Sequence, residues 1–176
     1  MLRYENDQLT PYLNRDLGLP SNEVRAILLA SDNSVWYATA QGIVQQTPDG
    51  KLIHFNEQNG LPAHFSMGLA EDREGRIWIA TGIGLAYIQQ GIVHVVSFPE
   101  HSDAQHAFSF SVVEKGTWIT TDRGLAYFDN ATQALSVIEK SQGLPVDKLF
   151  SIGIDHNSGV WPVSYTHLTL PTTPYV

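Results

Sequence analysis

Regularly spaced tryptophans constrain the fold of this chain more than any other feature. The 176 residues contain four, at intervals of 42, 40 and 43 residues: Trp36, Trp78, Trp118 and Trp161. The triplet Gly-Leu-Pro occurs at 18–20, 60–62 and 143–145, each time with its glycine 18 residues before a tryptophan. Glycine and an aliphatic residue follow the first three tryptophans at a distance of six residues, with the glycines at Gly42, Gly84 and Gly124. A fixed period of this length indicates a solenoid, a propeller or another repeat array.

Each repeat has the pattern of short β-strands separated by turns. In the second repeat, β-branched and alternating runs cover 65–72, 77–82, 85–89 and 92–98. Turn residues separate them, as at Glu74-Gly75 and Gln90-Gly91, and such pairs are hairpin signals. Four antiparallel strands in about 42 residues correspond to one propeller blade. We therefore predict an all-β fold, a partial β-propeller of four-stranded antiparallel blades.

The repeat resembles the two-component-regulator propeller repeat. The resemblance is clearest in the second repeat, where GLP is followed by DREGRIWIATGIGL at residues 72–85. The first repeat has Asn33 where the turn glycine is expected, and the third has Glu100-His101-Ser102 in place of GLP. The resemblance covers residues 1–161. It implies a seven-bladed propeller in the periplasmic sensor part of a bacterial signalling protein.

The repeat boundaries follow from these landmarks. Residues 1–17 correspond to the second half of a blade, 18–59 to repeat 1, 60–99 to repeat 2, 100–142 to repeat 3 and 143–161 to the start of repeat 4. Residues 162–176 match no blade position, and we interpret them as a sequencing or assembly artefact. Proline stands at 162, where the other repeats have Tyr37 or isoleucine, and proline is excluded from central strands.

These boundaries give about three and a half to four blades. The remaining blades of a parent protein would complete the ring. An incomplete ring leaves apolar blade faces in water, so we expect self-association or poor solubility of this chain.

Composition excludes several classes of function. The formal net charge of -8 argues against nucleic-acid binding, which depends on Lys and Arg neutralising phosphates. The absence of cysteine excludes a disulfide framework, thiolate catalysis and Cys-ligated metal. No apolar run approaches the roughly 18 residues of a membrane span, and the N-terminal residues lack the apolar stretch of a signal peptide.

The repeated glycines and tryptophans are best explained as structural residues. Gly82-Ile83-Gly84 is not a dinucleotide loop, because a third glycine is absent and a strand follows. We interpret Gly42, Gly84 and Gly124 as one turn position, where glycine tolerates a positive φ. The four tryptophans are either packing between blades or a stacking platform for a ligand, and their β-branched context favours packing.

The segment 99–108, PEHSDAQHAF, is the most irregular connection between repeats. Function in such scaffolds concentrates on loops, so we predict ligand contacts at His101, Asp103, Gln105 and His106. His101, Asp103 and His106 also offer nitrogen and oxygen ligands of the kind zinc accepts. Their spacing is not a recognised metal pattern, and a tolerated loop insertion is the alternative. We predict no metal and no cofactor.

The preferred functional hypothesis, which rests on the resemblance, is a ligand-sensing propeller segment of a bacterial two-component-type or cyclic-dinucleotide signalling receptor. The resemblance implies a periplasmic location, a small-molecule or glycan ligand, and a kinase or diguanylate cyclase output domain in the parent. No catalytic motif is recognisable, so we do not expect an enzyme. A propeller lyase or hydrolase and a protein-interaction scaffold remain as alternatives, since fold does not determine function.

Overall fold

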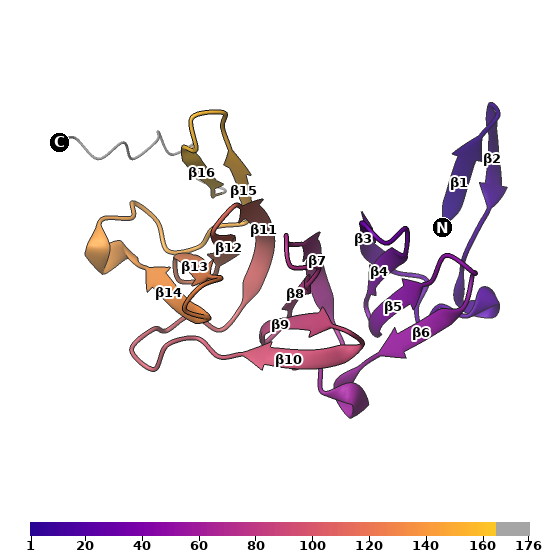
Figure 1. Cartoon of the computed structure of the whole chain (residues 1–176), viewed down its shortest axis with the longest axis horizontal. Coiled ribbons are helices and arrows are strands. Elements are labelled where there is room, and N and C mark those ends of the chain that lie inside the picture. Colours follow the sequence, from indigo (N-terminus) through magenta and orange to yellow (C-terminus); the bar gives the residue numbers. More distant parts are fainter. Residues whose placement is uncertain (165–176) are drawn as a thin grey trace.

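The computed structural model describes residues 1–164 and confirms the predicted all-β fold (Figure 1). Three sheets have four antiparallel strands in sequential order, and two further sheets have two strands each. The strands are β1 (Leu2–Glu5), β2 (Gln8–Pro11), β3 (Val24–Leu29), β4 (Val35–Thr39), β5 (Gly42–Gln46), β6 (Leu52–Phe55), β7 (Ser66–Glu71), β8 (Ile77–Thr81), β9 (Gly84–Gln89), β10 (Ile92–Val96), β11 (Ala107–Val113), β12 (Gly116–Thr121), β13 (Leu125–Asp129), β14 (Ala134–Ile138), β15 (Ser151–Ile154) and β16 (Val160–Val163). We name the complete sheets blade 1 (β3–β6), blade 2 (β7–β10) and blade 3 (β11–β14).

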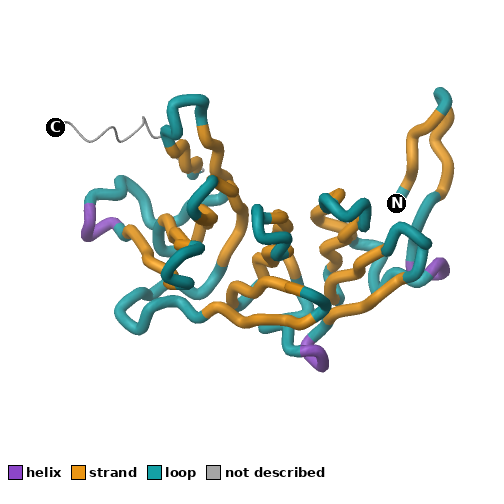
Figure 2. Tube along the Cα trace, in the orientation of Figure 1, coloured by secondary structure: helices purple, strands orange, loops and turns teal. Residues whose placement is uncertain are grey.

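The sheets follow one another around an arc, as expected for part of a propeller (Figures 1 and 2). The first strand of each blade contacts the first strand of the next, so that β3, β7, β11 and β15 form the inner row. Three short 3-10 helices precede the Gly-Leu motifs, at Arg15–Leu17, Glu57–Asn59 and Lys140–Gln142. None of the helices in residues 1–164 has the length and hydropathy needed to cross a membrane.

The core lies between neighbouring blades. Trp36 packs in the cluster between blades 1 and 2, where its ring stacks on Phe55 with centroids 5.6 Å apart. Trp78 is fully buried between blades 2 and 3 and meets Phe128 edge-on, with centroids 4.8 Å apart. Trp118 is only half-buried and packs on a neighbouring strand. At Trp36 and Trp78, the repeated tryptophan position therefore fills the space between one blade and the next.

The turns explain why the repeat tolerates substitutions. Gly75 adopts a φ of 71°, and Asn33 and Ser158 take nearly the same conformation at the equivalent position, with φ values of 66° and 65°. Asparagine enters this left-handed region more readily than most residues. Gly124 is more constrained, since a Cβ there would lie 2.2 Å from the carbonyl oxygen of Ile138.

Pro162 and Val163 lie in a strand, although we expected residues 162–176 to match no blade position, and the interpretation of these residues as an artefact stays a prediction. β16 includes Pro162 and Val163, and Pro162 pairs with Ile152 of β15. Proline is tolerated on an edge strand, and β15 is the only strand that pairs with β16 within residues 1–164. The rest of the predicted tail, from residue 165 and including His167, lies outside the described residues.

Candidate functional site

The starts of the inner strands bring cationic and aromatic side chains together. Strands β3, β7 and β11 each have a bulge after their first residue, which places Arg25, Met67 and Phe108 at equivalent positions. Phe150, just before β15, follows the same spacing. Bulges redirect single side chains and occur often beside functional sites. We name this set of residues the inner rim: Arg25, Phe65, Met67, Phe108, Lys148 and Phe150.

Arg25 joins blades 1 and 2 at the inner rim. Its guanidinium donates to Glu23 Oε1 at 2.9 and 2.6 Å and lies 3.9 Å from the ring centroid of Phe65. Its Nη1 is also 3.3 Å from Met67 Sδ. Contacts between a cation and a ring contribute about 0.5–1 kcal/mol at exposed sites. Arg25 is therefore held in place while its charged group stays partly accessible.

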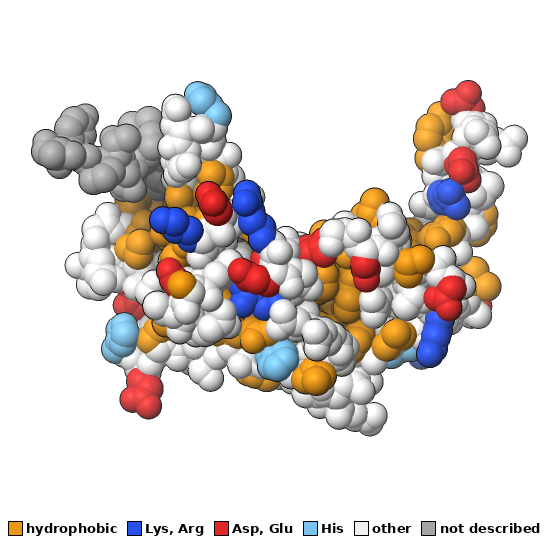
Figure 3. All heavy atoms as spheres, in the orientation of Figure 1, with side chains coloured by type: hydrophobic (Ala, Val, Ile, Leu, Met, Phe, Trp, Pro, Cys, Tyr) orange, Lys and Arg blue, Asp and Glu red, His pale blue; other side chains and the backbone are white. Residues whose placement is uncertain are grey.

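Lys148 forms a similar group at the other end of the inner row. The rings of Phe108 and Phe150 lie 5.2 Å apart, and Lys148 Nζ is 5.3 Å from the first and 5.0 Å from the second. Arg25 and Lys148 with their neighbouring rings therefore offer positive charge and aromatic faces together, a combination suited to an anionic ligand with an apolar or sugar-like face. The space-filling view shows Lys and Arg atoms beside hydrophobic and acidic side chains on the visible face of the arc (Figure 3).

The predicted ligand segment 99–108 borders the inner rim at His106. The His106 ring Nδ1 lies 2.9 Å from Asp122 Oδ2, and Asp122 Oδ1 accepts from the backbone N–H groups of Gln105 and His106 at 3.0 Å each. Burial disfavours the charged carboxylate, but these hydrogen bonds outweigh it and hold the pKa of Asp122 below its usual range. Asp122 therefore fixes the end of the segment as a carboxylate.

The other predicted ligand residues are not gathered into one site. The side chains of His101, Asp103 and Gln105 are exposed, and the segment is anchored instead by Ser102, whose hydroxyl donates to Glu139 Oε1 at 2.7 Å. Within residues 1–164, no three His, Cys, Asp or Glu side chains lie where they could hold a metal ion together. Of the four predicted residues, only His106 contributes its side chain to the hydrogen bonds described above.

Sequence reasoning missed Asp122, although the repeat contained the signal. Asp122 occupies the same repeat position as Ala40 and Gly82. The backbone N–H of each of these three residues donates to the carbonyl of the residue that, in its own blade, takes the position of His106 in blade 3. Superposing the repeats would have placed Asp122 beside His106.

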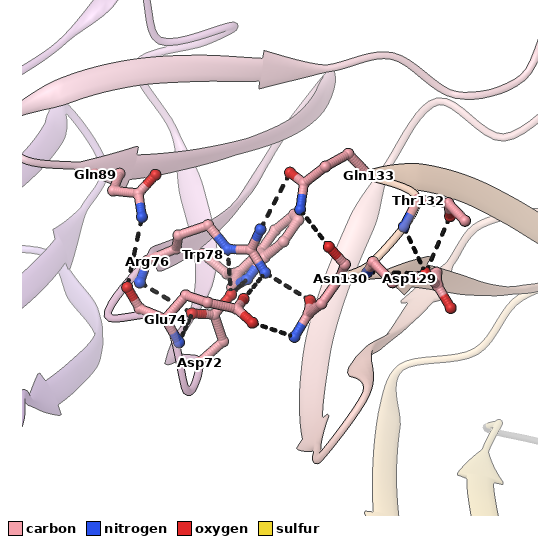
Figure 4. Close-up of polar contacts among 10 residues, drawn as sticks. Asp72, Glu74, Arg76, Trp78, Gln89, Asp129, Asn130, Thr132 and Gln133 are labelled. Atoms are coloured by element: carbon pink, nitrogen blue, oxygen red, sulfur yellow. Dashed lines mark hydrogen bonds and ion pairs between the residues drawn. The ribbon is translucent and has the colours of Figure 1, made fainter.

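A second polar cluster, the Arg76 network, lies between blades 2 and 3 (Figure 4). Arg76 is 3% exposed, and its Nε donates to Asp72 Oδ2 at 2.5 Å. Its Nη2 donates to Asn130 Oδ1 at 2.6 Å and to the Glu74 carboxylate, and Nη1 donates to Gln133 Oε1 at 3.3 Å. The Trp78 indole donates to the same Asp72 oxygen at 2.7 Å. Because every group is paired within the chain, this network is a clamp between blades.

The comparisons place the fold among propellers. Residues 60–82 match the family model described as "Two component regulator propeller", which confirms the resemblance for the second repeat. Curated protein sequences give no match.

Two similar solved structures are extracellular domains from B. thetaiotaomicron, described as belonging to hybrid two-component systems. Their TM-scores are 0.76 and 0.72 at 22% and 21% identity, and they cover 88% and 89% of this chain. This chain spans only 22% and 21% of theirs. Virginiamycin B lyase from Staphylococcus aureus is also similar, with a TM-score of 0.70, 18% identity, and coverage of 89% of this chain and 53% of the lyase. At these identities the likeness shows the propeller fold and nothing more.

Proposed function

We propose that this chain is a ligand-sensing propeller segment of a bacterial signalling receptor and works outside the cytoplasm. The single observation that carries the proposal is the match of the second repeat to the two-component-regulator propeller model. The extracellular domains with the same fold, described as parts of hybrid two-component systems, support the location.

The inner rim is the surface we assign to the ligand. Arg25 and Lys148 present positive charge, and the rings of Phe65, Phe108 and Phe150 present faces on which a planar or sugar ring can stack. The contacts lie at the junctions of inner strands, so a ligand that spans two junctions would favour one spacing of the blades. A ligand shifts such an equilibrium only by its differential affinity for the two arrangements.

A binding screen tests this assignment. We would screen the chain against acidic and neutral oligosaccharides and small carboxylates, and confirm binders by isothermal titration calorimetry. Arg25→Ala and Phe150→Ala should each weaken binding at least tenfold, because they remove a charged or an aromatic partner. Ile92→Ala, at an exposed position on the outer strand β10, is the matched control. Unchanged affinity in both rim variants would exclude the inner rim as the ligand site.

A propeller lyase or hydrolase is the second candidate. The hydrogen-bonded pair of His106 and Asp122, together with the similarity to virginiamycin B lyase, supports it. A carboxylate that orients an imidazole is a common element of acid–base catalysis. Turnover of a bound compound that disappears in His106→Ala, with binding retained, would favour the enzyme over the sensor.

A further inference from the structure

A pocket between blades 1 and 2 occupies the position that the Arg76 network fills between blades 2 and 3. Its volume is about 230 Å³, well above the roughly 30 Å³ that one water takes in the liquid. The walls come from the first hairpins of blades 1 and 2, from β5 and from the outer turn of blade 2. They include Ser31, Asp32, Trp36, Glu71, Ile88 and Gln90.

The two locations correspond position by position. Trp36 pairs with Gln45 across β4 and β5, as Trp78 pairs with Tyr87 across β8 and β9. By the same register, Ile88 takes the place of Phe128.

The polar walls correspond as well. Counting from the tryptophans, Asp32 takes the place of Glu74, and by the spacing of the outer turns Gln90 takes that of Asn130. One carboxylate and one amide are thus present at both interfaces, and of the three rings around Arg76 only that of Trp78 has an aromatic counterpart, Trp36.

The two residues of blade 2 that fill this site are replaced by smaller residues in blade 1. Ala30 stands at the position of Asp72, and Ser34 stands at the position of Arg76. Ser34 Oγ accepts the Trp36 indole N–H at 2.9 Å, which replaces the role of Asp72 toward Trp78. The buried arginine side chain therefore has no counterpart in blade 1, and its space is open.

The pocket presents carboxylate groups that can accept hydrogen bonds from a guanidinium. Hydrogen bonds from the Ser34 hydroxyl and backbone lower the pKa of Asp32, so this carboxylate is ionised at neutral pH. Both oxygens of Glu71 accept from Ser31, at 2.7 Å from its N–H and 2.6 Å from its hydroxyl. Each carboxylate can accept about four hydrogen bonds, so both can take further donors. No Lys or Arg is among the pocket residues, all of which lie in the described part of the chain.

We propose that this pocket binds a guanidinium group brought by a ligand from outside the chain, in the place that Arg76 occupies between the next two blades. The guanidinium would lie against Trp36, as that of Arg76 lies 5.6 Å from the Trp78 ring centroid, and would donate to Asp32 and Gln90. The planar fork of the group suits bidentate contact with a carboxylate. This site is separate from the inner rim and does not depend on the proposed sensing function.

The test uses ethylguanidinium as the probe and the four tryptophan indole N–H signals as the readout. In the 15N-labelled protein, ethylguanidinium should shift the signal assigned to Trp36, identified by its loss in Trp36→Phe. The affinity is expected in the millimolar range for so small a group. Asp32→Asn should weaken binding about tenfold, because it removes the charge from the hydrogen bond. The inner-rim variant Phe150→Ala should leave the affinity unchanged.

A transplant of the blade 2 residues is the decisive variant. Ala30→Asp with Ser34→Arg rebuilds the Asp72–Arg76 pair in blade 1 and should abolish the ethylguanidinium shift by filling the pocket. Free L-arginine and a blocked arginine-containing tripeptide, added in parallel, distinguish a small-molecule source from a peptide side chain. Absence of any Trp36 shift, an equal shift of Trp78, or a shift that persists in the transplant would each overturn the proposal. If the transplant does not fold, unchanged affinity in Asp32→Asn overturns it equally.

Discussion

Replacing Asp72 by alanine should be among the most destabilising single changes in this chain. Asp72 Oδ1 accepts from the backbone N–H groups of Glu74 and Arg76, both at 3.0 Å, and Oδ2 accepts from Arg76 Nε and the Trp78 indole. Asp72→Ala would leave a buried guanidinium without this carboxylate and three N–H groups without their acceptor. Breaking a buried ion pair by removing one partner costs about 3–5 kcal/mol.

The chain itself supplies the compensating change. Blade 1 has Ala30 and Ser34 at the equivalent positions, and Ser34 satisfies the tryptophan indole. The double variant Asp72→Ala with Arg76→Ser should therefore be more stable than Asp72→Ala alone by about 2 kcal/mol, because it removes the orphaned charge and provides a hydroxyl acceptor. Arg76→Ser alone should cost less than Asp72→Ala, since the carboxylate keeps three N–H donors.

Urea unfolding of the wild type, both single variants and the double variant measures the coupling. Tryptophan fluorescence reports the transition, and equal m-values would show that only stability has changed. If the double variant loses the sum of the two single losses, Asp72 and Arg76 do not act as a unit and the reasoning from blade 1 fails.

Four further changes test other parts of the structure. Trp78→Ala should cost about 3–5 kcal/mol in urea unfolding, because it leaves a cavity between blades, and a cost below about 1 kcal/mol would contradict core packing. Gly124→Ala should destabilise by about 1–3 kcal/mol or more, because φ is 145° and the new Cβ would clash with the Ile138 carbonyl; unchanged stability would disprove this strain. Asp122→Asn should lower stability at neutral pH, and the loss should shrink as the pH falls below the usual aspartate pKa of about 3.9, because the stability that a depressed folded-state pKa contributes is lost as the pH falls through the folded value; a loss that does not change on acidification would refute it. Leu29→Lys should reduce self-association in sedimentation velocity, because this side chain is 69% exposed on an apolar strand, and unchanged association would place the contact elsewhere.

The fold could be predicted because the sequence pattern of one blade recurs several times along the chain. One strand run would be ambiguous, but tryptophan, glycine and turn positions in register across the chain leave few alternatives to a blade. Pro162 is the counterexample. The exclusion of proline from central strands argued against a strand at this position. An edge strand accommodates proline, however, and only the pairing of β15 with β16 shows that Pro162 lies at an edge.

The candidate site was less predictable because its residues come from different blades. The segment 99–108 is irregular in the sequence, but the side chains of its predicted ligand residues His101, Asp103 and Gln105 are exposed, and their role stays a prediction. The inner rim arises from side chains about 40 residues apart, such as Arg25 and Phe65, which meet only when neighbouring inner strands lie together. Periodicity predicts that Arg25 is equivalent to Met67 and Phe108 to Phe150, and the structure shows that the residues of each pair are in contact.

This relation between repeats suggests where function is encoded in the chain. Positions that hold the blade, such as that of Trp78, keep their residue type from repeat to repeat. The position two residues before Arg25, Met67, Phe108 and Phe150 instead carries Glu23, Phe65, His106 and Lys148 in turn. No packing requirement shared by four blades would accept an acid, an aromatic ring, an imidazole and a base at one position. The four residues instead take part in different contacts, with Arg25, with Asp122 and with the Phe108–Phe150 ring pair. Because this position varies while the residues that hold the blade do not, it is the first choice for mutagenesis. Glu23→Lys, which introduces the lysine of the fourth repeat, should reverse the charge next to Arg25 and change the ligand preference. The midpoint of the unfolding transition should stay unchanged.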